Sequence, residues 1–233
     1  MPSTQIGLTR EIFLNVNEWF GPTLQGEGRH AGRRVSFLRL ANCNLSCSWC
    51  DTKYTWDWEN YDRSKEVHRK TLSELIEIVQ PMERRIIVTG GEPLTQATGL
   101  SLLMREFPDR LWEVETNGTR PLKATSGLWS TVTCSPKIIP SADAGPKAHE
   151  LADDVLEVAD FKFVIHDEQD VAVVERFIQD RSIDPERVWL MPEGITAEEL
   201  TARTPEVSEA ALRLGTNFTS RLHVYAWHEV RGH

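Results

Sequence analysis

Short apolar runs alternate along the chain with stretches in which apolar residues return every three or four positions. The short runs predict strands, and the longer period predicts amphipathic helices. Thr71 and Glu74 have the spacing of a capping box at the start of the first helix. Strands are expected at residues 35–40, 86–88, 111–114, 131–133, 161–165, 188–190 and 222–225, and helices around residues 72–79, 100–107, 155–159 and 171–178.

Alternating strands and helices indicate an α/β fold with a parallel sheet. About six such units are too few for a complete eight-stranded barrel, so a partial, open-sided barrel of (β/α)6 type is predicted. In barrel-like α/β folds, functional sites lie on the loops that follow the carboxyl ends of the strands. The polar and Gly/Pro-rich motifs of this chain follow predicted strands in the same way.

Length and charge narrow the class of protein. With 233 residues, the chain is expected to form a single domain over residues 1–233. A net charge of −9 argues against phosphate-backbone binding, so no nucleic-acid partner is expected. The first ten residues lack the apolar core of a signal peptide. No stretch approaches the roughly 20 apolar residues of a membrane helix, so a cytoplasmic location without membrane contact is expected.

Three cysteines, Cys43, Cys47 and Cys50, lie close together with the spacing C-x3-C-x2-C. Thiolates are the usual ligands of iron–sulfur clusters. Three of them can hold three irons of a four-iron cluster and leave the fourth iron open as a reaction site. The remaining cysteine, Cys134, is far away in sequence and is expected to be a buried thiol rather than a fourth ligand.

Two other interpretations of the cysteines stay open at this point. Zinc also binds sets of thiolates and imidazoles, and His30 or His68 could complete a Cys3His site. Free buried cysteines behave as small apolar residues and need no metal. The spacing of the three favours the cluster over both.

The cysteines occur together with the sequence Gly90-Gly91-Glu92-Pro93, which follows a predicted strand. The combination resembles the radical S-adenosylmethionine superfamily. The resemblance implies that the open iron is chelated by the amino and carboxylate groups of S-adenosylmethionine, and that residues 90–93 meet the methionine end of this cofactor. Glycines suit such a position because they allow the backbone to approach a ligand closely.

Further motifs narrow the resemblance, and together they extend over nearly the whole chain. They are residues 20–28, Arg39, the Cys50-Asp51-Thr52 sequence, residues 115–118, residues 135–137 and the chain end at residues 231–233. The set resembles the 7-carboxy-7-deazaguanine synthase family. The implied activity is that of a carbon–nitrogen lyase of 7-deazapurine (queuosine-type) biosynthesis. It converts 6-carboxy-5,6,7,8-tetrahydropterin by radical ring contraction to 7-carboxy-7-deazaguanine and ammonia.

The same resemblance implies which residues bind the pterin. Arg39 also fits on physical grounds, because a guanidinium can bind a carboxylate through two parallel hydrogen bonds. Without the resemblance, Arg39 could equally be a surface arginine and Glu27 a solvated loop carboxylate. The implied substrate-binding residues are Leu24, Gln25, Gly26, Glu27, Arg39, Thr89 and the terminal carboxylate of His233.

The resemblance also implies the cofactor ligands: a [4Fe-4S] cluster on the three cysteines, S-adenosylmethionine and Mg2+. Thr52 is expected to ligate Mg2+, which often takes few protein ligands; a helix N-cap is the alternative role of Thr52. The residues expected on the S-adenosylmethionine side are Trp49, Asp51, Gly91, Glu115, Ser135, Pro136, Lys137, Met191, Pro192, Glu193 and Gly194.

An external electron donor such as flavodoxin or ferredoxin and a homodimeric assembly are implied as well. One alternative remains inside the superfamily: an activating enzyme that generates a glycyl radical on a protein partner. Another is a protein without catalytic activity, an iron–sulfur electron carrier or a zinc-binding adaptor. A small-molecule cavity with Arg39 and Glu27 facing each other would favour the lyase over the activating enzyme.

Overall fold

A single nine-stranded sheet organises the chain in the computed structural model, which describes residues 12–139, 143–228 and 230–232. The strand order is β3-β1-β2-β4-β5-β6-β7-β8-β9. The strands are β1 (Phe13–Leu24), β2 (Arg34–Leu40), β3 (His68–Thr71), β4 (Arg85–Gly90), β5 (Leu111–Thr116), β6 (Thr131–Cys134), β7 (Asp160–Ile165), β8 (Val188–Pro192) and β9 (Asn217–Phe218). The helices are α1 (Arg63–Glu66), α2 (Leu72–Val79), α3 (Ala97–Glu106), α4 (Asp153–Val158), α5 (Glu168–Arg181), α6 (Ala197–Leu214) and α7 (Leu222–Trp227).

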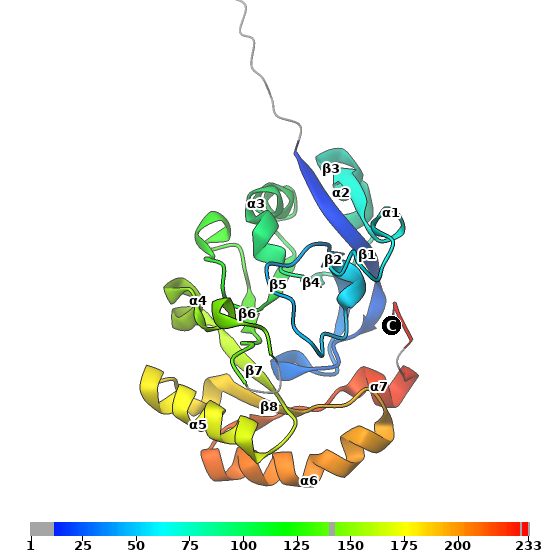
Figure 1. The fold of residues 1–233 in the computed structure, drawn as a ribbon. Coiled ribbons are helices and arrows are strands. Elements are labelled where there is room, and N and C mark those ends of the chain that lie inside the picture. The colour runs from blue at the N-terminus through cyan, green and yellow to red at the C-terminus, as the bar shows by residue number, and fades with distance from the viewer. Residues whose placement is uncertain (1–11, 140–142, 229, 233) are drawn as a thin grey trace, which may run out of the picture.

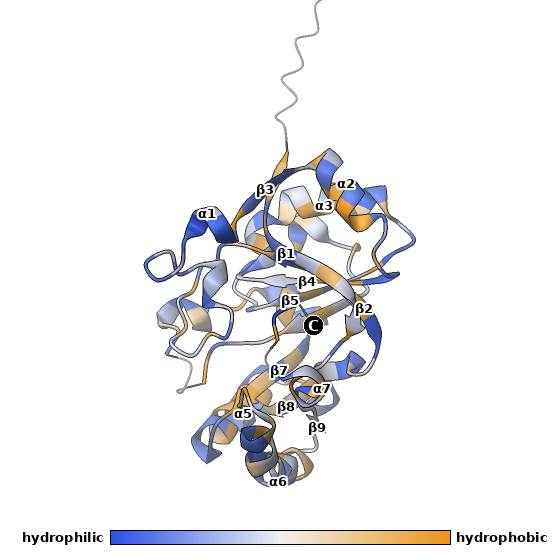
Figure 2. Cartoon of the chain, turned by 90° about the vertical axis from the view of Figure 1, so that its right-hand side faces the viewer, coloured by the Kyte–Doolittle hydropathy of each residue, from blue (hydrophilic) through white to orange (hydrophobic). Residues whose placement is uncertain are grey.

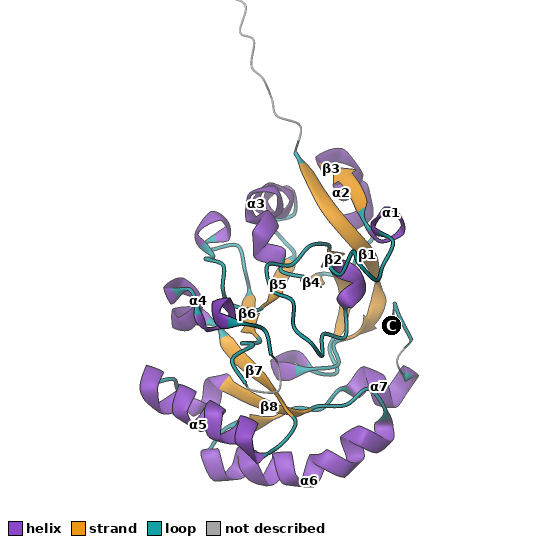
Figure 3. Cartoon of the chain, in the orientation of Figure 1, coloured by secondary structure: helices purple, strands orange, loops and turns teal. Residues whose placement is uncertain are grey.

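The sheet is parallel from β2 through β9, and β1 pairs antiparallel with both β2 and β3. It curves into an open barrel wall with the larger helices on its outer side (Figures 1 and 3). The predicted α/β fold with a partial barrel is therefore confirmed. No helix among the described residues has both the length and the apolar character needed to cross a membrane.

Two apolar cores fill the space between the sheet and the outer helices. One joins the outward residues of β1, β2, β4 and β5 to α2 and α3, and the other joins β5 to β8 with α4, α5 and α6. Helices α2 and α6 accordingly carry both apolar and polar residues (Figure 2). These cores hold the barrel wall in shape and leave its inner face for other side chains.

The inner face of the wall follows from the two-residue period of strands. Along β2, Leu38 and Leu40 belong to the outer core, whereas Val35 and Phe37 pack inside the barrel. Arg39 continues this inner row. Thr89 of β4 lies beside Arg39 in the parallel register. Polar side chains thus replace apolar ones toward the carboxyl ends of the strands.

The local predictions are largely confirmed. Six of the seven predicted strands lie within β2 and β4 to β8, and all four helical stripes coincide with helices. The capping box of α2 is present: Thr71 Oγ1 accepts from Glu74 N, and Glu74 Oε2 accepts from Thr71 N at 2.8 Å.

The strand predicted at residues 222–225 is wrong, because this segment forms helix α7. Its backbone is drawn away from the sheet: Leu222 N donates to Gly26 O at 2.9 Å, and the preceding Arg221 pairs with Glu27. The strand that follows β8 is instead the two-residue β9.

Strand β1 was not predicted, although it is the longest strand described. Its register with β2 shifts between Val16 and Glu18 and again between Phe20 and Thr23. Each such bulge reverses the alternation of faces, so no regular apolar pattern appears in the sequence. Residues 24–27, which precede the first predicted strand, begin at the end of β1.

Candidate active site

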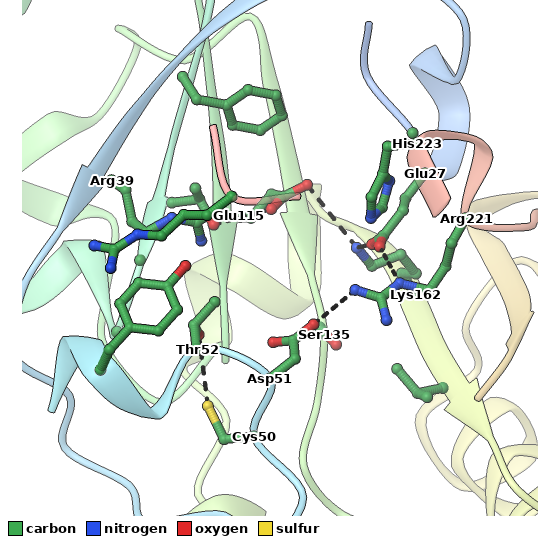
Figure 4. Close-up of a pocket in the computed structure, with 18 of the residues that line it drawn as sticks. Glu27, Arg39, Cys50, Asp51, Thr52, Glu115, Ser135, Lys162, Arg221 and His223 are labelled. Carbon is green, nitrogen blue, oxygen red and sulfur yellow. Dashed lines mark hydrogen bonds and ion pairs between the residues drawn. The ribbon is translucent and has the colours of Figure 1, made fainter. Parts of the chain in front are cut away.

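A cavity of about 430 Å³ opens at the carboxyl ends of the parallel strands. Cys43, Cys47 and Cys50 line one part of it, which we call the cysteine end. The charged end is lined by Glu27, Lys162, Arg221 and His223. Arg39 lies on the opposite side from the charged end, with Glu115 between them (Figure 4). Parallel strands bring these residues together because their carboxyl ends meet at one edge of the sheet.

The cysteine loop leaves the end of β2 and is fastened to the loop after β5. Asn117 Nδ2 donates to Asn44 Oδ1 at 3.1 Å and approaches Cys43 Sγ at 3.9 Å. The backbone N–H of Leu45 also donates to Cys43 Sγ, at 3.5 Å. Donors are therefore directed at Cys43 from two segments.

Cys50 receives two polar contacts of its own. Trp56 Nε1 donates to Cys50 Sγ at 3.4 Å, and Thr52 Oγ1 lies 3.5 Å from the same sulfur. Hydrogen bonds to sulfur are among the factors that set the potential of an iron–sulfur cluster. Thr52, expected to ligate Mg2+, lines the cavity directly beside the cysteine end.

The two glycines of the Gly90-Gly91 motif are required by packing against the cysteine loop. A Cβ on Gly90 would collide with the backbone of Leu40, and one on Gly91 would collide with the carbonyl of Asn42. Gly90 also has a φ of 132°, which side chains disfavour. Gly91 N donates to Leu40 O at 3.0 Å. The motif thus holds the start of the cysteine loop against β4.

Glu92 of the same motif stabilises the loop after β5 through hydrogen bonds. Its carboxylate is fully buried and accepts from Leu94 N, Thr116 Oγ1 and Asn117 N at 2.7–2.9 Å. Burial raises the pKa of Glu92, against the effect of these donors. Glu92 therefore connects β4 to the loop that carries Asn117.

The three thiols at the cysteine end are the kind of donor set that holds an iron–sulfur cluster. Among the described residues, no three His, Cys, Asp or Glu side chains are arranged to hold one metal ion. Trp49 lines the cavity beside the cysteines, and its buried Nε1 has no hydrogen-bond partner in the described part of the chain. Burial raises the pKa of Cys43 to about 12. Metal binding must therefore displace the proton of this thiol.

Three residues expected on the S-adenosylmethionine side gather next to the cysteine end. Lys137 Nζ donates to Ser135 Oγ at 2.7 Å and lies 5.2 Å from the centre of the Trp49 ring. The Lys137 charge also favours the thiolate of Cys47, although burial raises the pKa of that thiol overall. An ammonium, a hydroxyl and an aromatic face are thus available at this side of the cavity.

At the charged end, Glu27 lies between two buried cations. It is ion-paired with Lys162 Nζ and accepts from Arg221 Nε at 3.0 Å. Burial opposes its ionisation, but these two charges outweigh burial and hold the pKa of Glu27 well below its usual range. Burial likewise opposes the Lys162 ammonium, but Glu27 and Glu115 raise its pKa. Both groups are therefore charged at neutral pH.

Arg221 lies immediately before α7, and His223 lies in its first turn. Arg221 Nη2 donates to Asp51 Oδ2 at 2.7 Å, which links the charged end to the cysteine loop. His223 packs so closely on Gly26 that a Cβ there would collide with its ring. Burial lowers the pKa of His223, so the imidazole is neutral at physiological pH.

Glu115 lies among residues expected to bind substrate. Gln25 Nε2 donates to Glu115 Oε1 at 3.1 Å, and Thr89 Oγ1 donates to Oε2 at 2.9 Å. Lys162 Nζ is 3.9 Å from Oε1. The carboxylate thus occupies the middle of the cavity, in contact with the strand and loop residues expected on the pterin side.

The structure brings most of the predicted site residues to one cavity. Its lining includes Leu24, Gln25, Gly26, Glu27, Arg39, Cys43, Cys47, Trp49, Cys50, Asp51, Thr52, Thr89, Gly91, Glu115, Ser135, Lys137 and Met191. Pro136, Pro192, Glu193 and Gly194 do not line it. His233 lies outside the described residues. Cys134 is fully buried and stands apart from the cavity lining.

Sequence reasoning missed Lys162, Arg221 and His223. A signal for Lys162 exists, because it interrupts an apolar strand whose Phe161 and Phe163 face the outer core. By alternation, the lysine must face the barrel interior. Arg221 and His223 carry no such signal, since they precede and open a short helix.

Comparison with known proteins agrees with this site. Residues 24–120 match the family described as a 4Fe-4S single cluster domain. The 7-carboxy-7-deazaguanine synthase of Halobacterium salinarum is 36% identical over 93% of this chain and 91% of its own length. That of Pyrobaculum aerophilum is 37% identical over 90% of this chain and 93% of its own length.

This chain belongs to the 7-carboxy-7-deazaguanine synthase family. The crystal structure of QueE from Escherichia coli shares the fold, with a TM-score of 0.68 and 24% identity over 91% of this chain and 95% of that chain. Family membership implies an iron–sulfur cluster and S-adenosylmethionine, and the glycyl-radical activating alternative is not favoured.

Proposed function

We propose that this chain catalyses the radical ring contraction of 6-carboxy-5,6,7,8-tetrahydropterin to 7-carboxy-7-deazaguanine with release of ammonia. The observation that carries the proposal is one cavity with three thiols at one end and complementary charges at the other. A bicyclic substrate with a carboxylate and several ring N–H groups needs both cationic and anionic partners. Arg39 supplies the first and the carboxylates of Glu27 and Glu115 supply the second.

The cysteine end would hold the cofactors. Cys43, Cys47 and Cys50 would ligate the [4Fe-4S] cluster, and the open iron would bind S-adenosylmethionine. When bound, this pair would supply the radical chemistry for hydrogen-atom transfer at C6 of the pterin. The residues proposed to position S-adenosylmethionine directly are those that line the cavity: Trp49, Asp51, Gly91, Glu115, Ser135, Lys137 and Met191. Their chain neighbours Pro136, Pro192, Glu193 and Gly194 do not line it and would act by shaping the two loops.

The remaining lining residues would bind and orient the pterin. Arg39 would bind its carboxylate, and Thr89 and residues 24–27 would contact its ring. The pair of Lys162 with Glu27 keeps that carboxylate ionised and fixed in position, so it can accept from ring N–H groups without first reorganising. Neutral His223 beside Gly26 would close this end of the cavity.

Four further assignments complete the proposal: a metal site, an electron donor, a location and an assembly. Mg2+ would bind at Thr52, beside the cysteine end, where the hydroxyl would supply one hard oxygen ligand. An external donor such as flavodoxin or ferredoxin would reduce the cluster. The chain would act in the cytoplasm as a homodimer, the commonest assembly of soluble proteins.

Anaerobic turnover tests the proposal directly. Protein with about four irons per chain is incubated with reductant, S-adenosylmethionine, Mg2+ and the carboxypterin, and products are identified by mass. The expected product is the deazaguanine acid, with S-adenosylmethionine regenerated. Cleavage of S-adenosylmethionine without any ring-contracted product would overturn the substrate assignment. One zinc per chain without sulfide would overturn the cluster itself.

A further inference from the structure

Glu18 lies directly opposite Arg39 across the antiparallel pair of β1 and β2. The register shift between Val16 and Glu18 re-aims the β1 side chains at this point. As a result, both Glu18 and Arg39 line the cavity. The carboxylate therefore lies where it can control the proposed substrate-binding arginine.

Glu18 occupies one edge of the Arg39 guanidinium and leaves another open. Arg39 Nε donates to Glu18 Oε1 at 2.7 Å. Within the part of the chain that the structure describes, no hydrogen bond is formed by either Nη group of Arg39. A guanidinium held at Nε still presents its Nη1–Nη2 edge, which binds a carboxylate through two parallel hydrogen bonds. Glu18 thus fixes the plane in which a ligand carboxylate must lie.

The second oxygen of Glu18 is bound by the C-terminal segment. Arg231 Nε donates to Glu18 Oε2 at 2.9 Å. Arg231 also donates to Glu66 at 2.8 Å and to Asn17 at 3.1 Å, and its guanidinium lies 4.1 Å from the centre of the Tyr54 ring. The C-terminal end accordingly lies beside β1 (Figures 1 and 2).

We propose that Glu18 is a positioning residue that couples the docking of Arg231 to the orientation of Arg39, and thereby selects pterins that carry a carboxylate. This inference rests on the proposed function, because it takes Arg39 as the ligand of the pterin carboxylate. One carboxylate can couple two guanidiniums, because one of its oxygens holds Arg39 and the other holds Arg231.

The charge of Glu18 is as important as its shape. The Arg39 and Arg231 side chains both approach this one carboxylate. A neutral residue here would leave two guanidiniums close together without the anion between them. Arg39 would then turn away from Arg231 and lose its fixed plane. Tyr54 Oη lies 3.4 Å from Glu18 Oε1, which is long for a hydrogen bond between oxygens. This hydroxyl therefore does not replace the negative charge of Glu18.

The test compares the binding of two ligands to the cluster-loaded, S-adenosylmethionine-bound protein under anaerobic conditions. One ligand is 6-carboxytetrahydropterin, and the other carries a methyl group at C6 instead of the carboxylate. In Glu18→Gln, the preference for the carboxylated ligand is expected to fall roughly tenfold, while the affinity for the methyl ligand stays within about twofold. The variant is nearly isosteric, and its thermal melting is measured alongside.

A matched control is available on the same strand. Arg34 of β2 pairs with Glu83 at 2.7 Å on the exposed surface, away from the cavity. Glu83→Gln removes the same charge from the same kind of pair and is expected to leave the preference unchanged. Glu18→Asp provides a second variant at the site itself. It keeps the charge but is too short to reach both arginines, and an intermediate loss is expected.

The coupling to the C-terminal segment has its own readout. Arg231→Ala is expected to lower the carboxylate preference in the same direction as Glu18→Gln, by roughly threefold. Because Arg231 is proposed to act through Glu18, the double variant should be no worse than Glu18→Gln alone. Simple addition of the two losses would overturn the coupling.

The remaining outcomes separate this inference from the proposed function. Equal loss of both ligands in Glu18→Gln would mark a structural role and overturn the inference. A preference that collapses in Arg39→Ala but survives in Glu18→Gln would also overturn it and leave the proposed function intact. Wild-type protein that selects the carboxylated ligand through Glu18 but forms no ring-contracted product would instead overturn the proposed function alone.

Discussion

The cysteine end and the charged end of the cavity are assembled from very different lengths of chain. The three thiols and the contacts of Cys50 with Thr52 and Trp56 come from one short segment. The charged end joins Glu27 to Lys162, which is 135 positions away in sequence, and to Arg221, which is 194 positions away. The first is a local motif, and the second exists only after β1, β7 and α7 have come together.

The two ends also differ in how their charges are balanced. Burial raises the pKa of the Cys43 and Cys47 thiols, so metal must replace their protons when it binds. At the charged end, Glu27 is already ionised by the pairing with Lys162 and Arg221. The cysteine end is therefore completed by its cofactor, whereas the charged end is complete in the folded chain. Substitutions at the two ends should separate cofactor binding from substrate binding.

The largest expected effect comes from removing one thiol. Cys43→Ala should abolish turnover and most of the bound iron, because the cluster loses one of its three protein ligands. Binding of the pterin should persist, since the charged end does not depend on the thiol. Iron analysis and calorimetric titration measure the two quantities.

Cys134→Ala is the matched control for that experiment. Cys134 is fully buried and is not part of the cavity lining. The iron content of the Cys134→Ala variant should stay at the wild-type level. Loss of iron in Cys134→Ala would show that the cluster depends on a fourth cysteine.

A substitution at the charged end should weaken substrate binding strongly but leave the iron content of the protein unchanged. Lys162→Met leaves Glu27 and Glu115 without their buried ammonium. Loss of one partner of a buried ion pair costs about 3–5 kcal/mol of unfolding free energy, and a pterin affinity at least about 100-fold lower is expected. Denaturation and substrate titration provide the measurements.

Two companion variants sharpen this prediction. Lys70→Met removes a half-exposed ammonium paired with Glu74 on the surface and should leave the unfolding transition unchanged. Glu27→Leu combined with Lys162→Met should recover part of the lost stability, because the buried Glu27–Lys162 pair is then removed as a whole and Arg221 keeps its pairing with Asp51. A double variant less stable than Lys162→Met would contradict this account.

A smaller effect is expected at the cysteine end from Trp56→Phe. The indole N–H donates to Cys50 Sγ at 3.4 Å, and a donor to sulfur stabilises the reduced, more negative cluster. A net hydrogen bond of about 0.5–1.5 kcal/mol corresponds to a midpoint potential roughly 20–60 mV lower in the variant. Potentiometric titration followed by electron paramagnetic resonance measures it, with Trp58→Phe as control. An unchanged potential would show that this contact does not reach the cluster.

The smallest expected effect is a pH dependence at His223. Burial lowers the pKa of this histidine in the folded state, so the unfolded chain takes up its proton first as the pH falls. Stability should therefore decrease below about pH 6.5, the ordinary histidine pKa. His223→Gln should weaken that decrease by about 1 kcal/mol or less. Melting curves at several pH values check it; a steeper acid loss in the variant would reverse the sign.

Much of the fold could be predicted because its signals are local. Apolar runs marked six strands of the sheet, and the Thr71–Glu74 capping box marked the start of α2. Strand β1 was not predicted because two bulges disturb the alternation of apolar and polar residues along it. Segment 222–225 was misassigned because long-range bonds from Gly26 and Glu27 draw it off the sheet. The sequence of a short apolar segment gives no information about such distant partners.

The sequence by itself determined the chemistry of the cysteine end, since spacing along one segment is enough to specify three thiols on one cluster. It also named most of the cavity lining through motifs that follow strands. Only the tertiary structure decided the charged end and the placement of Glu18 between Arg39 and Arg231. The physical reason is that an ion pair requires proximity in space, and residues as distant in sequence as 18 and 231 acquire it only when the barrel wall and the C-terminal segment pack together.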